Sequence, residues 1–515
     1  MLGDKRTELD EEFTVSFGYQ CQLPKDNLIQ ASDRRKDSQT DTYLECSKIP
    51  RRSGSFSCLS GAALSANATS GNTNLCNGLI GAEILPGLDS PKSFRRITSM
   101  PSFSRWDILS STLQTNVSLS NPLSPHNDLL ERETTKLKSM SAPSRSEGFF
   151  NEMEVQMAGG AAGEDRVQTI CCEENELLFC AVYDGFNGRD AADFLAGTLY
   201  ENLRFCLSQL DWTNKQGIDI DSDPNLDFPI DNSLGERLSS EINKSIVSDN
   251  EIPLDSFKNG VIHSLRHALA QAESDFLSMV EQEMDDRPDL VAIGSCVLVL
   301  LLIGKDLYIL NLGDSKAVLA STQGIMEEPQ AVKAIQLTCS HSVDNETERA
   351  LLLINHPNDP STISFGRVKG KLKLTRAFGV GYLKRTEMND ALLGILRVPN
   401  LLSPPYISNQ PFLNVRRVSE SDHFVIVASD GLFDFFSNDE AVKLVYSIIC
   451  NSHFGDPAKF LLEHLISRAA QSAGFSVDEL MRIPAGRRRK YHDDVTVIVI
   501  ILGSNQRTCT ASTYM

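Results

Sequence analysis

The sequence predicts a mixed α and β fold, and three observations support that class. Apolar runs of strand length recur after residue 150, two of them are joined by a hairpin link, and amphipathic helices separate others. The strand candidates are 177–184, 295–304, 306–315, 423–431 and 495–502. Because only the link Gly-Lys-Asp at 304–306 joins the second and third runs, we expect this pair to be antiparallel.

Three helices are predicted from apolar periodicity and from the residues at their ends. Residues 256–284 carry a single apolar stripe formed by Val261, Leu265, Ala268, Leu269, Ala272, Phe276 and Val280. Ser437 and Glu440 have the spacing of a capping box, so a second helix should begin there. The third helix is expected to have Asp456 as its cap, Pro457 as its first residue and Gly474 as its terminator.

The domain organisation follows from composition. Residues 1–149 are rich in Ser, Thr, Asn and Pro, and we expect them to be disordered. Within them, 51–57 and 93–105 place hydroxyls just after arginines, which suits basophilic kinases; the alternative is a solvated tail of low complexity. The folded domain is predicted over 150–504, with an acidic surface insertion at 211–253 and a flexible tail at 505–515.

Composition and charge exclude several classes of function. The formal net charge of -19 argues against a general nucleic-acid binder, and no apolar run is long enough for a transmembrane segment. No signal-peptide pattern is present at the N-terminus, so a cytoplasmic or nuclear location is expected. The 12 cysteines lack zinc-ligand spacing and are expected to be reduced thiols.

Aspartates fall repeatedly at the ends of the predicted strands. Asp184, Asp314 and Asp430 each close an apolar run, and Asp493 and Asp494 precede the last one. Any single Asp-Gly pair is also an ordinary turn sequence, but a carboxylate beside a β core needs a partner. If these side chains converge, an all-oxygen ligand set would favour Mg²⁺ or Mn²⁺, and a metal pair would suit phosphate-ester hydrolysis.

Six motifs, in order and spacing, resemble those of the type-2C metal-dependent protein phosphatases. They are "GEDRVQ", "VYDGFNG", "LYILNLGDSKAVL", "GRVKGKLKLTRAFGVGYLK", "IVASDGLFDFFSNDEAV" and "YHDDVTVIVI". After Asp-Gly the sequence has Phe-Asn where most relatives have His-Gly. In this respect it resembles the plant POLTERGEIST-like branch. The resemblance implies an α+β fold, a four-layer αββα sandwich of two antiparallel β-sheets flanked by helices. It also implies a centre of two Mg²⁺ or Mn²⁺ ions per subunit.

The same resemblance implies the ligands of the two metals. Asp184 matches the aspartate that bridges both ions, and the carbonyl of Gly185 matches a ligand of one of them. Asp430 and Asp493 match the remaining carboxylate ligands, so these three aspartates would act in catalysis through metal-bound water.

Three further matches lie around that set. Glu164 and Asp165 match an acidic pair that holds metal-bound waters from the second shell, and Asp314 matches an aspartate linked in some relatives to a third, weaker metal.

The sequence also departs from the family pattern at three positions. Phe186 stands where most relatives have a His proposed as general acid, Gly160 where they have a phosphate-binding Arg, and Val380 where they have an Asp. Arg166, beside the acidic pair, is a hypothetical replacement for the phosphate contact, with a solvated surface Arg as the alternative. We interpret His492 as a surface residue, with a replacement general acid as the alternative, and His263 and His267 as part of a polar helix face. The basic run 486–490 is interpreted as a solvated charge run, with attraction of phosphorylated acidic substrates as the alternative.

The resemblance therefore implies a protein serine/threonine phosphatase that acts on phosphorylated proteins by attack of a metal-activated water. The missing His should slow the reaction without abolishing it, because general acid catalysis contributes about 10²- to 10⁴-fold. A regulatory pseudophosphatase that is weak or inactive is the alternative. A monomer without a transmembrane segment is expected, and nucleic acid is not an expected partner.

Overall fold

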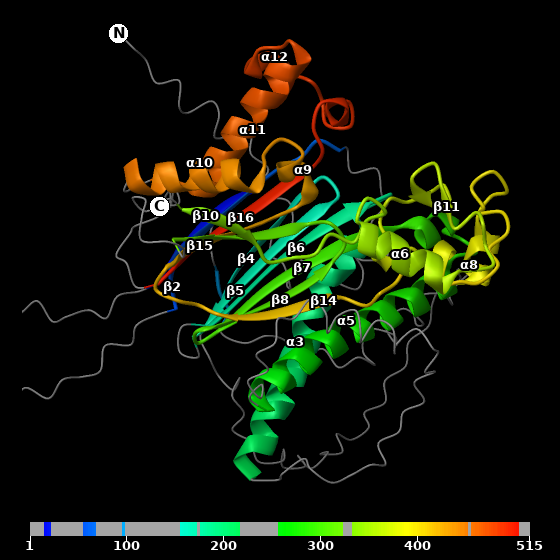
Figure 1. The fold of residues 1–515 in the computed structure, drawn as a ribbon, viewed down its shortest axis with the longest axis horizontal. Coiled ribbons are helices and arrows are strands. Elements are labelled where there is room, and N and C mark those ends of the chain that lie inside the picture. Colours follow the sequence, from blue (N-terminus) through cyan, green and yellow to red (C-terminus); the bar gives the residue numbers. More distant parts are fainter. Residues whose placement is uncertain are drawn as a thin grey trace, which may run out of the picture.

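Two antiparallel β-sheets are stacked face to face, with helices on both outer faces (Figure 1). This computed structural model describes residues 15–21, 55–67, 95–97, 155–172, 176–216, 256–322, 332–451 and 455–503. Leucine, isoleucine and valine side chains from the two inner faces form the core between the sheets, among them Leu178, Val182, Leu300 and Ile498. The predicted four-layer α+β sandwich is confirmed.

The first sheet has the strand order β1-β2-β16-β15-β9-β10. Its strands are β1 (Val15–Gln20), β2 (Phe56–Leu64), β9 (Lys316–Ser321), β10 (Lys333–Gln336), β15 (Asp422–Ala428) and β16 (Val495–Leu502). The outer face is covered by α10 (Asn438–Asn451), which packs on β9 and β10, and by α11 (Pro457–Ala473), which packs on β2 and β16. β16 is buried along its whole length, and all of its residues except Thr496 are apolar.

The second sheet has the order β14-β8-β7-β6-β5-β4-β3, and β13 (Phe378–Gly379) pairs with β7. Its strands are β3 (Arg95–Ile97), β4 (Val155–Ala162), β5 (Asp165–Cys172), β6 (Leu177–Phe186), β7 (Gly294–Ile303), β8 (Asp306–Leu312) and β14 (Phe412–Arg417). The outer face is covered by α3 (Asp190–Gln216) and α5 (Ser256–Glu283), which are followed by the short helix η1 (Pro288–Ala292). The antiparallel link between β7 and β8 is confirmed, with Gly304 at φ 55° in the turn.

The helix ends follow the predicted capping chemistry. At α10, the backbone N–H of Ser437 donates to Glu440 Oε2 at 2.9 Å, and the N–H of Glu440 donates to Ser437 Oγ at 3.3 Å. Asp456 caps α11, and Gly474 ends it at φ 76°. Ser476 and Glu479 form a second capping box on α12 (Val477–Met481), ahead of the short helix η2 (Arg488–Lys490). Within the described residues, no helix is long and apolar enough to cross a membrane.

The N-terminal region contributes strands, so the prediction of disorder over all of 1–149 was wrong for its described parts. β2 lies between β1 and β16, and β3 pairs with β4. Small residues fill β2, and almost all are buried, so no alternation marked it in the sequence. Ser55, in one of the two kinase motifs, is also buried, which argues against its phosphorylation in the folded protein.

Most other residues of 1–149 lie outside the described residues, as do 217–253 of the predicted insertion and all of the tail predicted at 505–515. The described helix α3 continues to Gln216, so the helix extends past the insertion's predicted start at 211.

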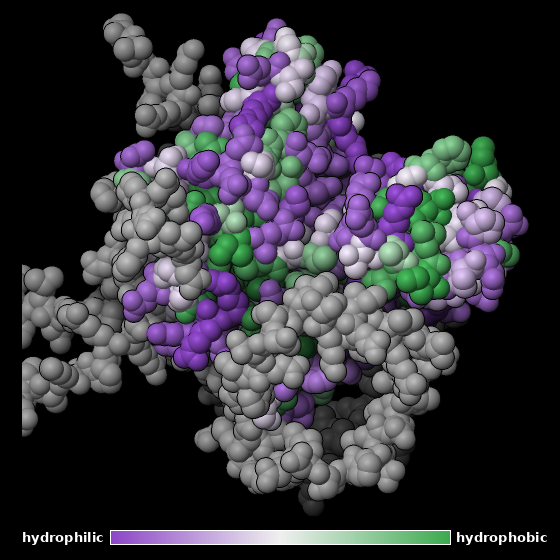
Figure 2. Space-filling view, in the orientation of Figure 1, coloured by the Kyte–Doolittle hydropathy of each residue, from purple (hydrophilic) through white to green (hydrophobic). Residues whose placement is uncertain are grey.

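A small lobe projects from one end of the sandwich, between β10 and β14 (Figure 1). It contains α6 (Glu346–Asn355), β11 (Ile363–Ser364), β12 (Arg367–Val368), α7 (Gly381–Lys384) and α8 (Thr386–Ala391). Inside the lobe, Lys369 and Asp359 form a buried ion pair at 2.7 Å, and the Tyr406 hydroxyl donates a hydrogen bond to Asp359. Figure 2 shows hydrophobic surface on the visible face of the lobe. The large hydrophobic side chains exposed on the lobe are Leu353, Ile354, Phe365, Leu393, Ile395, Leu396 and Leu402.

Candidate active site

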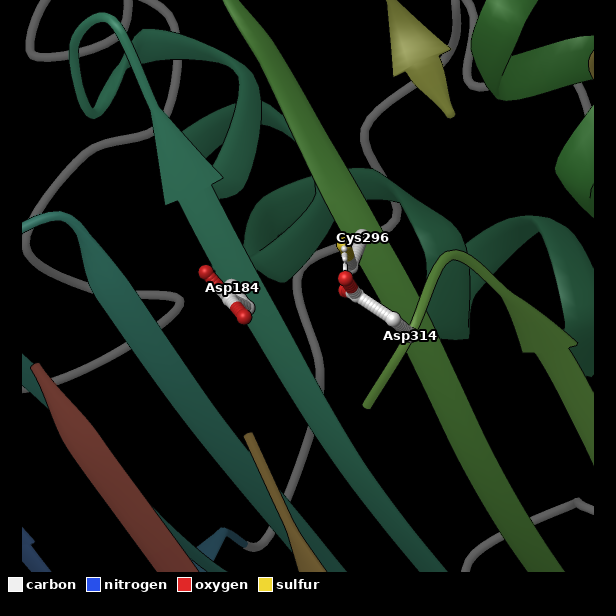
Figure 3. Close-up of side chains that lie close together, drawn as sticks. All are labelled: Asp184, Cys296 and Asp314. Atoms are coloured by element: carbon white, nitrogen blue, oxygen red, sulfur yellow. Dashed lines mark hydrogen bonds between the residues drawn. The ribbon is translucent and has the colours of Figure 1, made fainter. Parts of the chain in front are cut away.

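Three side chains from neighbouring strands meet at one edge of the second sheet (Figure 3). Asp184 on β6 lies directly opposite Cys296 on β7, and Asp314 follows β8. The Cys296 thiol donates to Asp314 Oδ1 at 3.3 Å, and one possible ligand atom from each of the three residues lies within 4.8 Å of the others. The predicted convergence of Asp184 and Asp314 is therefore present, and Cys296 is an unexpected neighbour.

Asp184 and Gly185 lie within a strand and not in a turn. β6 continues to Phe186, with Asp184 paired to Cys296 and Gly185 paired to Ser295. Glycine is required here by close approach, because a Cβ on Gly185 would lie 2.5 Å from the carbonyl oxygen of Glu164. The Asp-Gly sequence therefore packs the strand bearing Asp184 against the turn bearing Glu164.

Asp430 reaches the same place from the first sheet. It is the first residue of the short helix α9 (Asp430–Phe433), which follows β15 directly. Loss of contact with water and the negative charges of Asp314, Asp434 and Asp493 raise the pKa of Asp430 to about 7. Burial and the carboxylates of Asp165 and Asp430 likewise raise the pKa of Asp184 well above its ordinary value.

Asp493 and Asp494 have different roles although they are adjacent. Asp493 is 35% exposed and accepts hydrogen bonds from the Asn67 amide at 3.2 Å and from the Asp494 N–H at 2.8 Å. Asp494 is buried, and its carboxylate accepts the backbone N–H groups of Ala66 at 2.6 Å, Asn67 at 2.9 Å and Glu164 at 2.8 Å. Asp494 therefore fixes the backbone around the site, a role that the sequence did not reveal.

The acidic pair Glu164 and Asp165 lies at the turn between β4 and β5. Burial and the charges of Asp494 and Asp493 raise the pKa of Glu164 to about 7, against a smaller opposing effect of Arg489. Asp165 is buried, and its Oδ2 accepts the Thr496 hydroxyl of β16 at 2.8 Å. The pair thus lies close to Asp493 and Asp494.

Arg166 does not contact the site, and its prediction as a phosphate ligand was wrong. The side chain is 1% exposed, and its Nε forms an ion pair with Asp193 on α3. Its Nη1 donates to the carbonyl oxygens of Gly163 at 3.0 Å and Asp165 at 2.6 Å. Since the guanidinium makes these contacts inside the fold, the alternative of a solvated surface Arg is wrong as well.

Two histidine interpretations have different outcomes. His492, predicted at the surface, is buried, and burial lowers its pKa, while its Nδ1 lies 2.7 Å from the Asp493 carbonyl oxygen. A neutral, enclosed imidazole of this kind is a poor proton donor. His263 and His267 are exposed on α5, as a polar helix face requires.

The donor set fits hard divalent cations. Carboxylates dominate it, they come from both sheets, and each of Glu164, Asp165, Asp184, Asp314 and Asp430 has a pKa raised by burial and by neighbouring negative groups. Such repulsion is relieved by bound Mg²⁺ or Mn²⁺. Asp434 also lies near this cluster. Its position four residues after Asp430 could have indicated this proximity, because side chains four residues apart are neighbours on a helix.

A four-layer sandwich with this carboxylate cluster between its sheets defines a metal-dependent phosphoprotein phosphatase. A family model described as "Protein phosphatase 2C" matches residues 230–474. "Probable protein phosphatase 2C 40" of Arabidopsis thaliana is 56% identical over 98% of this chain and 98% of its own length. "Probable protein phosphatase 2C 39" of Oryza sativa subsp. japonica is 51% identical over 97% of this chain and 94% of its own.

The chain belongs to the protein phosphatase 2C family and is a protein serine/threonine phosphatase. The names of these relatives do not specify a branch, so the resemblance to the POLTERGEIST-like branch stays a prediction.

Proposed function

We propose that this phosphatase hydrolyses phosphoserine and phosphothreonine with two Mg²⁺ or Mn²⁺ ions held by Asp184, Asp430, Asp493 and the Gly185 carbonyl. One observation carries the proposal. Burial and the carboxylates of Asp165 and Asp430 raise the pKa of Asp184 on β6, and burial and the carboxylates of Asp314, Asp434 and Asp493 raise the pKa of Asp430 at the start of α9. Without cations, this arrangement is costly to the fold.

When bound, such a metal pair activates water and neutralises charge on a phosphoryl group. The chain's own residues orient the ligands. Asp494 holds the N–H of Glu164, and the lack of a side chain at Gly185 lets Asp184 approach the Glu164 turn. Glu164 and Asp165 are proposed to hold waters at the centre, and Asp314 is proposed to serve a third, weaker ion.

Phe186 has no proton to give to the leaving alcohol. The serine or threonine oxygen must then take its proton from solvent, so the reaction is expected to be slower than with an acid at this position. The substrate is a phosphorylated protein, and we also propose a monomer located in the cytoplasm or nucleus. Of the kinase motifs, the hydroxyls at 98–104 remain candidates for phosphorylation.

The test uses the full chain, because β1 and β2 belong to the first sheet. Phosphate release from a phosphothreonine peptide should require Mn²⁺ or Mg²⁺, stop with EDTA, and fall by orders of magnitude in Asp184→Asn. Turnover that persists with EDTA, or that is untouched by Asp184→Asn, would overturn the proposal. Metal binding without turnover would instead support the pseudophosphatase alternative.

A further inference from the structure

Within the described part of the chain, neither Gly160 nor Arg166 can supply a cation for the substrate phosphate. Gly160 lies within β4, where it pairs with Val167 and offers no side chain. Arg166 is enclosed by its contacts with Asp193 and with backbone carbonyls. A phosphate group drawn to a cluster of carboxylates needs a positive side chain near it, since otherwise the remaining ligands repel it.

Arg489 is placed where such a group is needed. Its Nη1 lies 3.8 Å from Glu164 Oε2, and its Nη2 lies 3.5 Å from Asp493 Oδ2. These two carboxylates come from opposite sheets, so the guanidinium lies across the edge where the sheets meet. The Arg489 side chain is nevertheless 51% exposed, whereas that of Glu164 is only 9% exposed. One side of the guanidinium contacts the carboxylates, and the rest is open to solvent.

The surrounding backbone fixes Arg489 in this position. It lies in η2, whose neighbour Arg488 donates from Nε to the Ile483 carbonyl at 3.1 Å. The N–H of Gly486 donates to the Ala66 carbonyl at 2.7 Å, which joins this loop to the N-terminal segment. Arg489 Nη1 also donates to Asn67 Oδ1 at 3.0 Å, and the Asn67 amide group donates to Asp493. Asn67 therefore orients Arg489 and Asp493 together.

Two lysines near the cluster are less suitable. The charge of Lys316 acts on Asp314 and Asp434, and its Nζ lies 4.8 Å from the centre of the Phe433 ring. The charge of Lys373 also acts on Asp434. An arginine also presents two parallel N–H groups that match two phosphate oxygens, which a lysine does not.

We propose that Arg489 binds the substrate phosphate, in the place of the missing Arg at Gly160. This inference rests on the proposed metal centre. Once cations occupy the carboxylates, the attraction of Glu164 and Asp493 for Arg489 is reduced, and the guanidinium becomes free to pair with phosphate oxygens. The charge run that looked like a solvated surface in the sequence thus contains a positioned member, Arg489, beside the exposed Arg487.

The test measures binding of inorganic phosphate, the reaction product, to the full chain loaded with Mn²⁺, by titration calorimetry and by product inhibition. Arg489→Ala should weaken phosphate binding by about 10-fold or more, and Arg489→Lys should restore part of it. KM for the phosphopeptide should rise in parallel. Arg487→Ala is the matched control and should bind phosphate as the wild type does.

A separate Mn²⁺ titration distinguishes a phosphate contact from a counterion of the ligands. We expect Arg489→Ala to bind Mn²⁺ at least as tightly as the wild type, because a positive charge beside the metal site has been removed. Weaker Mn²⁺ binding with unchanged phosphate affinity would show a purely structural role and overturn the inference. A wild-type chain that binds no Mn²⁺ would overturn the proposed function and, with it, this inference.

Discussion

Phe186 and Val380 cover the same face of Gly294, the first residue of β7. A Cβ on Gly294 would lie 2.6 Å from Phe186 Cζ and 2.5 Å from Val380 Cγ2. Val380 adopts φ 55°, a conformation that a β-branched residue rarely takes. Two of the three departures from the family pattern therefore share one apolar contact beside the carboxylates, so they should be considered as a coupled pair.

We expect Phe186→His to raise kcat, because it places a proton donor two residues after Asp184 on the same strand. The gain should approach the lower end of the range for general acid catalysis, about 10²-fold, and should add an alkaline limb to the pH dependence of kcat. Phosphopeptide hydrolysis across pH provides the measurement. Phe186→Leu, which keeps the apolar contact, is the control, and a kcat for the His variant no higher than for Leu would contradict the prediction.

Breaking the buried ion pair of Arg166 should destabilise the fold without affecting phosphate binding. Arg166→Met leaves the Asp193 carboxylate buried, with Arg189 as its remaining partner at 3.4 Å, and should cost about 3 kcal/mol. Urea unfolding gives this value. The double variant Arg166→Met/Asp193→Leu should recover much of the loss. A rise in KM for the folded Arg166→Met protein would instead indicate that Arg166 contributes to substrate binding, and would contradict the prediction.

The metal-free protein should lose stability as pH rises. The pKa of both Glu164 and Asp430 is raised to about 7 in the fold, so their neutral forms favour folding at low pH, and this contribution is lost as pH rises from about 4 through 7. Mn²⁺ should therefore raise the melting temperature more at neutral than at acidic pH. Asp430→Asn should reduce the pH dependence of the stability of the metal-free protein. An equal Mn²⁺ effect at both pH values would count against the prediction.

A chain beginning at residue 150 should fail to fold. It lacks β2, the partner of β16, and the Ala66 and Asn67 groups that donate to Asp494. Circular dichroism and Mn²⁺ binding of the purified fragment, compared with the full chain, would show this. Asn67→Ala in the full chain should keep the fold but disturb Asp493 and Arg489. A fragment that is folded and binds Mn²⁺ would refute the assignment of β2 to the domain.

The sequence was informative where local chemistry determines structure. The hairpin at Gly304, the caps at Ser437 and Asp456, and the apolar stripe of α5 all depend on residues close together in the chain. The carboxylates of the site could be grouped because their motifs resemble a family.

What the sequence could not reveal depends on distant partners. Arg166 looked available because its partner, Asp193, lies on a helix whose packing the local sequence does not specify. Asp494 and Asn67 meet across 427 positions, and β2 is composed of small residues that carry no strand periodicity. The sequence does not distinguish Arg489 from the other residues of the basic run 486–490, because the structure of the surrounding loop determines its position.

The pairing of β16 with β2 also determines when the enzyme can form. β16 is the last strand of the described chain and lies between β2 and β15, so β2 has no neighbour on that side until the C-terminal residues have left the ribosome. Asp493 and Arg489 arrive with the same final segment. A nascent chain from which residues 489–502 have not yet emerged therefore lacks both a central strand of the first sheet and part of the proposed metal centre, and it should not remove phosphate from a protein.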